Sequence, residues 1–197
     1  MKVYDRIRVD QLFLATMGVL LFGLSLAGLF HGMNASLAAH WAWKAEYGTS
    51  APEVEQVTDS CRRAFGLYPW NYYFSIFASE LAYYNADEVT GAQREERLHQ
   101  SKLWCERGLM QNRYRSQLRR LKTRFLWDDS PSEAIAYWEG HTNWQYWEPY
   151  NHETLAGLYT KYGEFDKAAR ELKLLVNFPA YETTRALIES EKKIWAE

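Results

Sequence analysis

Six positively charged side chains fall within twelve residues in the middle of the chain, and no acidic residue interrupts them. Guanidinium groups form charge-assisted, often paired hydrogen bonds with carboxylates and phosphates. One interpretation is a groove that holds an acidic peptide segment, a C-terminal carboxylate or an anionic lipid headgroup. The other is that nearby carboxylates, such as those of Asp128, Asp129 and Glu133, offset the charge of a solvated helix face. The predicted partner-binding residues are Arg113, Arg115, Arg119, Arg120, Lys122 and Arg124.

A second candidate is the aromatic run over 137–150, which holds six Tyr and Trp residues in fourteen positions. The spacing of Tyr137, Trp144 and Trp147 suits burial on one helix face, so we expect most of the run to be core. Trp138 and Tyr146 fall off that face. We therefore predict that these two are exposed and available for protein contacts or for stacking on sugars.

The residue patterns of most enzymes are missing from this sequence. It has no glycine-rich phosphate or dinucleotide loop, no CxxC and no CxxCH. The segment His152–Ala156 begins like the zinc motif HExxH but lacks the second histidine, so it cannot supply the paired ligands. We predict a protein that is not an enzyme, with no catalytic, cofactor-binding or metal-binding residue.

Two cysteines, Cys61 and Cys105, lie 44 residues apart. An extracytoplasmic location would permit a disulfide between them. Neighbouring helix axes are about 8–10 Å apart, whereas a disulfide needs Cα atoms within about 7 Å. We favour two buried free thiols over the disulfide.

The elements that carry these residues are predicted to be helices, because helical periodicity recurs and period-two alternation is absent. The segments Ser50–Glu53 and Ser130–Glu133 each combine a capping box with a proline in the first turn. They predict helices that run to about Gly66 and Asn143. A helix over 113–126, which would carry the basic residues, is indicated by an apolar stripe of Tyr114, Leu118, Leu121 and Phe125.

The run from Leu12 to Phe30 contains no charged residue and is about as long as a membrane-spanning helix. Lys2, Arg6 and Arg8 precede it, and no Lys or Arg follows until Lys44. The positive-inside rule then predicts a bacterial inner-membrane protein with a cytoplasmic N-terminus and a periplasmic domain. The alternative is a signal peptide cleaved near Ser36–Ala38, but signal cores have only about 7–15 apolar residues, so we expect an uncleaved anchor.

The predicted organisation follows from this span. Residues 1–10 form a cytoplasmic N-terminus, 11–32 a transmembrane helix, 33–49 an interfacial connector helix and 50–197 a helical-repeat domain. The net charge of −2 gives the chain no strong electrostatic bias. His31 at the end of the span, together with His40, Trp41, Trp43 and Tyr47 of the connector, is expected to form an aromatic collar at the membrane surface.

Small residues fall on one face of the span, where Gly28 and Gly32 form a GxxxG pair. Small residues let a neighbouring membrane helix approach closely. The alternative is that glycine is simply common in membrane helices. The predicted transmembrane packing face consists of Gly18, Ser25, Gly28 and Gly32, and the sequence leaves open whether its partner is a second copy or another protein.

The segment 155–172 resembles a tetratricopeptide repeat. The positions that match are Leu155, Ala156, Tyr159, Gly163 and Ala168, while Leu172 replaces the usual Phe and His152 the usual Trp. The resemblance is close over 149–180 and loose over 50–180, where boundaries near 69, 112 and 149 exceed the family period of about 34 residues. It implies an all-α fold: one N-terminal transmembrane helix, then a short stack of antiparallel helix pairs closed by a helix near 181–196.

Members of this repeat family usually scaffold other proteins, so the resemblance implies a scaffold rather than a catalyst. We expect a membrane-anchored accessory or assembly subunit of a larger membrane complex. Its partners would be other membrane protein subunits, with an acidic peptide or anionic lipid at the basic helix. Nucleic acid is not expected as a partner outside the cytoplasm. The alternative function is a glycan-binding or glycan-handling envelope protein that uses exposed aromatic side chains.

Overall fold

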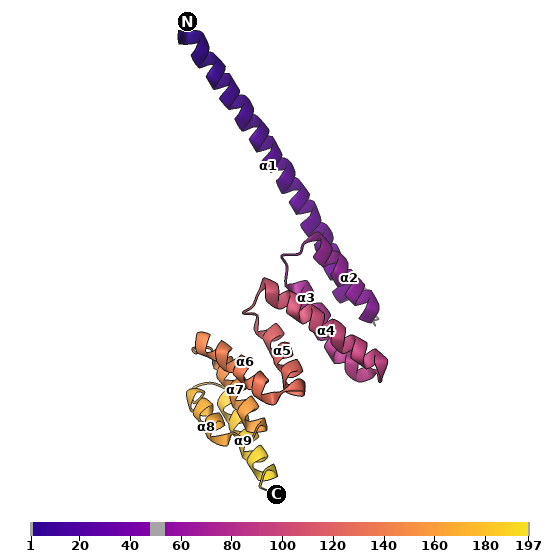
Figure 1. The fold of residues 1–197 in the computed structure, drawn as a ribbon, viewed down its shortest axis with the longest axis vertical. Helices are drawn as coiled ribbons and strands as arrows, with labels where there is room; N and C mark the ends of the chain where they lie inside the picture. The colour runs from indigo at the N-terminus through magenta and orange to yellow at the C-terminus, as the bar shows by residue number, and fades with distance from the viewer. Residues whose placement is uncertain (1, 48–53, 197) are drawn as a thin grey trace. The chain divides into compact units, whose positions relative to one another are not determined.

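The computed structural model describes residues 2–47 and 54–196, with side chains from residue 11 onward (Figure 1). Within these ranges the regular structure is entirely helical, which confirms the predicted all-α class. The predicted capping box at Ser50–Glu53 lies outside the described residues. The elements are α1 (Lys2–Tyr47), α2 (Val54–Leu67), α3 (Tyr73–Asn85), the short 3₁₀ helix η1 (Ala86–Glu88), α4 (Ala92–Gln111), α5 (Ser116–Asp129), α6 (Pro131–Trp144), α7 (Pro149–Lys161), α8 (Phe165–Leu174) and α9 (Ala180–Ile194).

Helix α1 is one unbroken helix of 46 residues. Its part from Gln11 onward is, among the described residues, the one helix long and apolar enough to cross a membrane. The predicted boundary between residues 32 and 33 is not a break in the helix. Ala38 and Ala45 on the following turns are buried, so this part of α1 is a core element rather than a separate connector.

The chain divides into two compact units, the first of which ends at Arg113. In this unit α1 packs on α2, α2 on α3, and α3 on α4. Its core combines small side chains with a few large ones: Ala45, Val57, Cys61 and Ala78 cluster with Trp104, and Ala38 lies with Ala64 and Phe74. Small side chains on facing helices allow the backbones to approach closely, which is why α1 and α2 pack tightly along this stretch.

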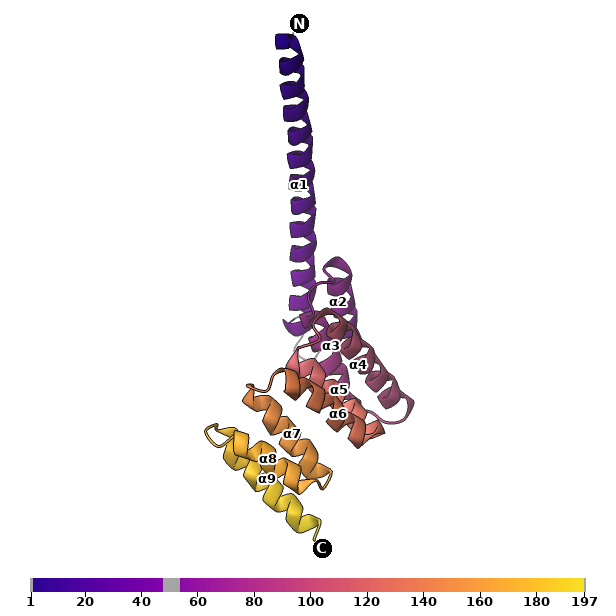
Figure 2. The ribbon, with the colours of Figure 1, turned by 60° about the vertical axis from the view of Figure 1, so that its left-hand side comes forward.

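The second unit begins at Tyr114 and contains α5 to α9. Figure 2 shows α7, α8 and α9 side by side, and each of the three contacts the other two. Gly163 turns the chain between α7 and α8 with a φ of 81°, a left-handed conformation that favours glycine. Ala156 and Ala168 have no exposed surface, so the two helices meet at small residues as the sequence predicts.

Two boundaries differ from those predicted, and a third agrees but is formed in a different way. The single repeat domain expected over 50–197 is two units, each with its own core. Helix α5 begins at Ser116 rather than at residue 113. Helix α6 begins at Pro131 as predicted, but the Ser130 side chain makes no capping bond and instead lies 3.2 Å from the Ser132 hydroxyl. The carbonyl oxygen of Ser130 accepts the first hydrogen bonds of α6, so proline and backbone geometry are sufficient to start it.

Candidate partner-binding surface

Four of the six basic residues predicted as a binding site lie on α5, namely Arg119, Arg120, Lys122 and Arg124. Arg115 is the N-cap residue of this helix and is partly buried. Arg113 belongs to the first unit. The predicted helix over 113–126 therefore starts too early, because the Tyr114 position continues the apolar stripe although its backbone precedes the helix.

Three cations of α5, namely Arg119, Arg120 and Lys122, lie over tyrosine rings. The Arg119 guanidinium is 5.4 Å from the centre of the Tyr137 ring, and the Lys122 ammonium is also 5.4 Å from it. Arg120 lies 5.0 Å from the Tyr150 ring. Arg120 and Lys122 form no ion pair with any residue that the structure describes. Electron-rich ring faces thus hold Arg120 and Lys122 in place without neutralising them, which leaves positive charge for an acidic partner.

The aromatic run is distributed differently from the prediction. Trp138, expected to be exposed, has no exposed surface, and its indole N–H donates to the carbonyl oxygen of Asn151 at 3.1 Å. Trp144 and Trp147, expected in the core, are 50% and 62% exposed. The prediction for Trp138 is wrong because helical spacing was extended past Trp144, where α6 ends. Tyr146, predicted to be exposed, is 68% exposed.

The connection between α6 and α7 is held by buried polar side chains of α7. The Asn151 amide donates to the carbonyl oxygen of Gln145 at 3.0 Å. The His152 ring contacts the carbonyl oxygen of Tyr146 on one side and the Glu171 carboxylate on the other, the latter at 2.7 Å. His152 therefore has a structural role here. These contacts fix the backbone that carries Tyr146 and Trp147, so two exposed rings are presented by a rigid connection.

Ring contacts join this connection to α5. Tyr114 stacks on Trp144 with centroids 4.1 Å apart, Trp144 contacts Trp147, and Trp147 contacts Tyr146. Arg119 lies 6.0 Å from the Tyr114 ring and links the stack to Tyr137. We call this set the basic–aromatic surface: Tyr114, Arg119, Arg120, Lys122, Tyr137, Trp144, Tyr146, Trp147 and Tyr150. Sequence reasoning missed the three tyrosines that hold the cations, and their abundance beside the basic run was the available signal.

One buried titratable group borders this surface. His141 is buried on α6, where its ring packs edge-on against Trp138. Burial, and then the positive charge of Arg119, lower the pKa of His141 to about 4. The ring is therefore neutral at pH 7, and the positive charge of the basic–aromatic surface at that pH comes from arginine and lysine alone.

The predicted packing face of α1 meets open space. A Cβ atom added at Gly18, Gly28 or Gly32 would find no heavy atom within 4 Å outside the helix's own backbone. Ser25 donates its hydroxyl to the carbonyl oxygen of Leu21, which leaves no polar hydrogen projecting from the face. The face is thus bare within the described part of the chain.

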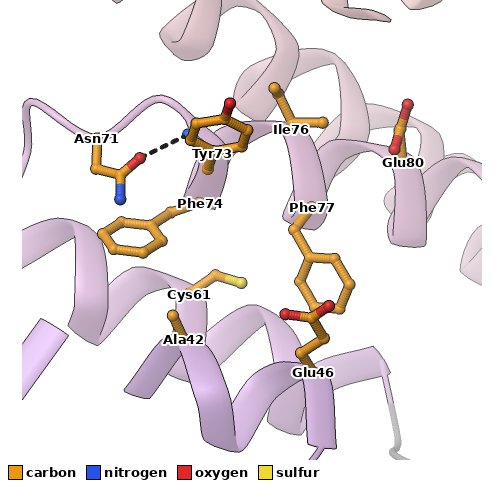
Figure 3. Close-up of a pocket in the computed structure, with 9 residues that line it drawn as sticks. All are labelled: Ala42, Glu46, Cys61, Asn71, Tyr73, Phe74, Ile76, Phe77 and Glu80. Atoms are coloured by element: carbon orange, nitrogen blue, oxygen red, sulfur yellow. Dashed lines mark hydrogen bonds between the residues drawn. The ribbon is translucent and has the colours of Figure 1, made fainter. Parts of the chain in front are cut away.

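The first unit contains a cleft of about 370 Å³ between α1, α2 and α3. Figure 3 shows Cys61 between the rings of Phe74 and Phe77, with Glu46 beside Phe77. Burial raises the pKa of the Cys61 thiol to about 12, so it remains a protonated thiol rather than a reactive thiolate. Cys61 and Cys105 are both buried free thiols, which is the alternative that the sequence favoured.

Among the described residues, no group of three or more His, Cys, Asp or Glu side chains is placed to hold a metal ion. No protein-family model, curated protein or solved structure matches the chain. A function must therefore be inferred from the chemistry of the surfaces themselves.

Proposed function

We propose that this protein is a non-enzymatic, membrane-anchored scaffold that serves as an accessory or assembly subunit of a larger membrane protein complex. The observation that carries the proposal is the basic–aromatic surface, where cations held over tyrosines lie next to exposed tryptophans on a rigid helical unit. Arg, Trp and Tyr are the residue types that contribute most to protein–protein binding energy. A surface of this kind suits a folded or extended protein partner that carries carboxylates.

The anchor in this proposal is α1, with Lys2, Arg6 and Arg8 on the cytoplasmic side and both compact units in the periplasm of a bacterial cell. The small-residue face would contact transmembrane helices of the partner subunits, because small residues let a neighbouring helix approach closely. An anchor that packs on the complex and a second surface that binds it outside the membrane would act together. Two linked contacts raise overall affinity without any new interaction.

The repeat resemblance indicates how the second unit would bind a partner. The α7–α8 hairpin has a glycine with positive φ in its turn and two fully buried alanines, which are compatible with this resemblance. In that register α5 is a first helix, and first helices of such repeats line the concave surface that holds peptides. The acidic partner segment would then lie along α5.

The test uses the full chain with a C-terminal tag, extracted in mild detergent and separated on a native gel with mass spectrometry of its band. Arg120→Glu combined with Lys122→Glu reverses two positive charges of the basic–aromatic surface on α5. Lys192→Glu combined with Lys193→Glu makes the same charge change on exposed residues of α9 and is the matched control. We expect the wild type and the control to migrate with one set of membrane proteins, and the α5 variant to lose them.

Migration of the wild type by itself would contradict the proposal. Equal retention of partners by the α5 variant and the control would contradict the assignment of the basic–aromatic surface. A charge effect shared by both double variants would have the same consequence, since it would reflect net charge rather than a site.

Glycan binding is the second candidate, and the exposure of Tyr146 and Trp147 favours it. Flat exposed rings on a fixed backbone are suited to stacking on sugars. Tyr146→Ala combined with Trp147→Ala should then abolish co-sedimentation with peptidoglycan, while charge reversal on α5 leaves it unchanged. Tyr162→Ala combined with Trp195→Ala removes the same ring types from elsewhere in this unit and is the control. Wild-type protein that stays in the supernatant would exclude this candidate.

A further inference from the structure

The height of each part of the first unit above a membrane can be read along α1. At about 1.5 Å per residue, the run Leu12–Phe30 is about 28 Å long, which matches a hydrocarbon core of about 30 Å. If α1 spans the bilayer, as the proposed function requires, Phe30 lies at the edge of the hydrocarbon. His31 is then the first residue at the level of the headgroups, a layer about 5–8 Å thick on each side.

The turn between α2 and α3 lies at this same level. The Tyr68 ring packs edge-on against the His31 ring, with centroids 5.1 Å apart. Helix α2 runs antiparallel to α1, since the core places Ala64 with Ala38 but Val57 with Ala45. The chain therefore returns toward the apolar segment of α1 before it enters α3. In Figures 1 and 2 the turn after α2 is the part of α2 to α4 that lies nearest to that segment.

The side chains of this turn are apolar and amphipathic rings that face outward. Trp70, two residues after Tyr68, is 76% exposed, and Pro69 beside it is exposed as well. Tyr73 is exposed at the start of α3, with its ring stacked on Tyr72 at 4.8 Å. Trp and Tyr favour the membrane–water interface, where the ring contacts acyl chains and the polar tip stays hydrated. Transfer of so exposed an indole from water to the membrane–water interface is therefore favourable in free energy.

The turn is also held in shape. The Asn71 side chain accepts a hydrogen bond from the backbone N–H of Tyr73 at 3.1 Å, drawn in Figure 3. The backbone N–H of Asn71 donates to the carbonyl oxygen of Tyr68 at 3.3 Å. Trp70 is therefore presented in one backbone conformation rather than on a loose loop.

We propose that the α2–α3 turn is a second membrane contact, which inserts Trp70 and its neighbouring rings into the headgroup layer of the membrane that α1 spans. It replaces the aromatic collar predicted on α1 itself. Trp43 lies 13 residues beyond Phe30, about 20 Å further along the helix and outside the headgroup layer. The contact fixes the tilt of the first unit against the bilayer, because the anchor and the turn are two separate points of attachment.

The experiment places an environment-sensitive dye at one position at a time in the full chain, reconstituted in phosphatidylcholine–phosphatidylglycerol vesicles. Trp70→Cys tests the turn, and Trp43→Cys is the matched control, since it replaces another exposed tryptophan of the same unit. Phe22→Cys, near the middle of the apolar run, reports whether α1 is inserted. The chain without an added cysteine gives the background, because Cys61 and Cys105 are buried. Nitroxide lipids labelled at the headgroup or at mid-chain serve as quenchers.

We expect the dye at position 70 to show blue-shifted emission and strong quenching by the headgroup nitroxide. The dye at position 43 should emit as in water and lose little intensity. Equal, weak quenching at 70 and 43, with position 22 quenched by the mid-chain nitroxide, would overturn the second contact and leave the anchor intact. Absence of mid-chain quenching at position 22 would overturn the anchor and this inference together.

Discussion

The two units of this chain are held together by different kinds of side chain. The first buries small residues where helices cross, and the fully or nearly fully buried ones include Ala38, Ala45, Ala64, Ala78 and Ala82. The second buries fewer alanines and more large aliphatic and polar side chains, among them Leu118, Leu155, His141 and Asn151, while both units bury aromatic rings. A core of small residues has no room for added volume, whereas a core of larger side chains loses packing when one of them is shortened. The unit that contains α1 is therefore held by close packing of helices. In the unit that carries the basic–aromatic surface, buried polar side chains also hold the connection between helices in place.

The buried side chains that form hydrogen bonds between elements are also larger in the second unit. In the second unit, buried side chains reach across the fold to loop backbone or to other helices, as Trp138 does to Asn151 and as Tyr159 does to Glu139 at 2.5 Å. In the first, the Ser101 hydroxyl of α4 donates to the carbonyl oxygen of Ser79 on α3 at 2.7 Å and so joins two neighbouring helices. Four changes, from the largest expected effect to the smallest, test this contrast.

Trp138→Ala should destabilise the second unit by about 3–5 kcal/mol, because it leaves a cavity and removes the bond to Asn151. Hydrogen exchange followed by mass spectrometry on the full chain reads each unit separately. We expect exchange to accelerate in α6 to α9 and to stay unchanged in α2 to α4. Trp138→Phe, which retains most of the ring, should cost less. A uniform acceleration in both units would show that they do not differ in this way.

Acid should weaken the second unit through His141. The pKa of this group is lowered to about 4 in the folded chain, whereas an unfolded histidine titrates near pH 6.5. Between these values the unfolded state binds more protons, so stability is lost as the pH falls from about 6.5 to about 4, by up to about 3 kcal/mol. Urea unfolding at pH 7.0 and pH 4.5 measures the loss. His141→Phe should reduce the pH dependence, and an unchanged dependence would remove His141 as its source.

Ala78→Leu should destabilise the first unit by about 1–3 kcal/mol, since the alanine is fully buried between helices and larger side chains force them apart. Ala136→Leu, on an exposed position of α6, is the matched control and should have little effect. The readout is again hydrogen exchange, now with acceleration confined to α1 to α4. Tolerance of leucine at Ala78 would mean that the first unit is not closely packed.

Ser101→Ala should have the smallest effect, about 1 kcal/mol, because it removes a single neutral hydrogen bond within a contact that small residues already hold. Asn151→Ala provides the comparison in the second unit and should cost more, since its amide fixes the connection that carries Tyr146. Thermal unfolding of both variants in the same detergent compares them directly. A larger loss for Ser101→Ala would reverse the assignment of polar bonding to the second unit.

The features that sequence predicted correctly are those that depend on a few neighbouring residues. Pro131 starts α6 because its fixed φ suits a first helical turn, and Gly163 ends α7 because a left-handed turn needs no Cβ. The apolar run of α1 and the pair of alanines at positions 156 and 168 belong to the same class, because composition and spacing alone determine them.

The features that sequence missed depend on contacts between distant residues. Trp138 was predicted to be exposed and is buried, and Trp144 was predicted to be buried and is exposed. The reason is that helical spacing ends where α6 ends, and no residue near Trp144 marks that end in the sequence. The division at Arg113 depends on which helices share a core, and the cation positions on α5 depend on Tyr137 and Tyr150 from two other helices. None of these can be read from the periodicity of one segment.

Because α1 is continuous, the number of residues between Gly32 and Ala38 determines how the small-residue face is rotated relative to the first unit. Gly32 lies on the face with open space and Ala38 lies in the core, and nothing but helix separates them. With 3.6 residues per turn, inserting one residue there would rotate the face by about 100° around the helix axis relative to the first unit. The number of residues between the small-residue face and the core therefore fixes the direction, around the helix axis, in which a neighbouring membrane helix lies relative to the first unit.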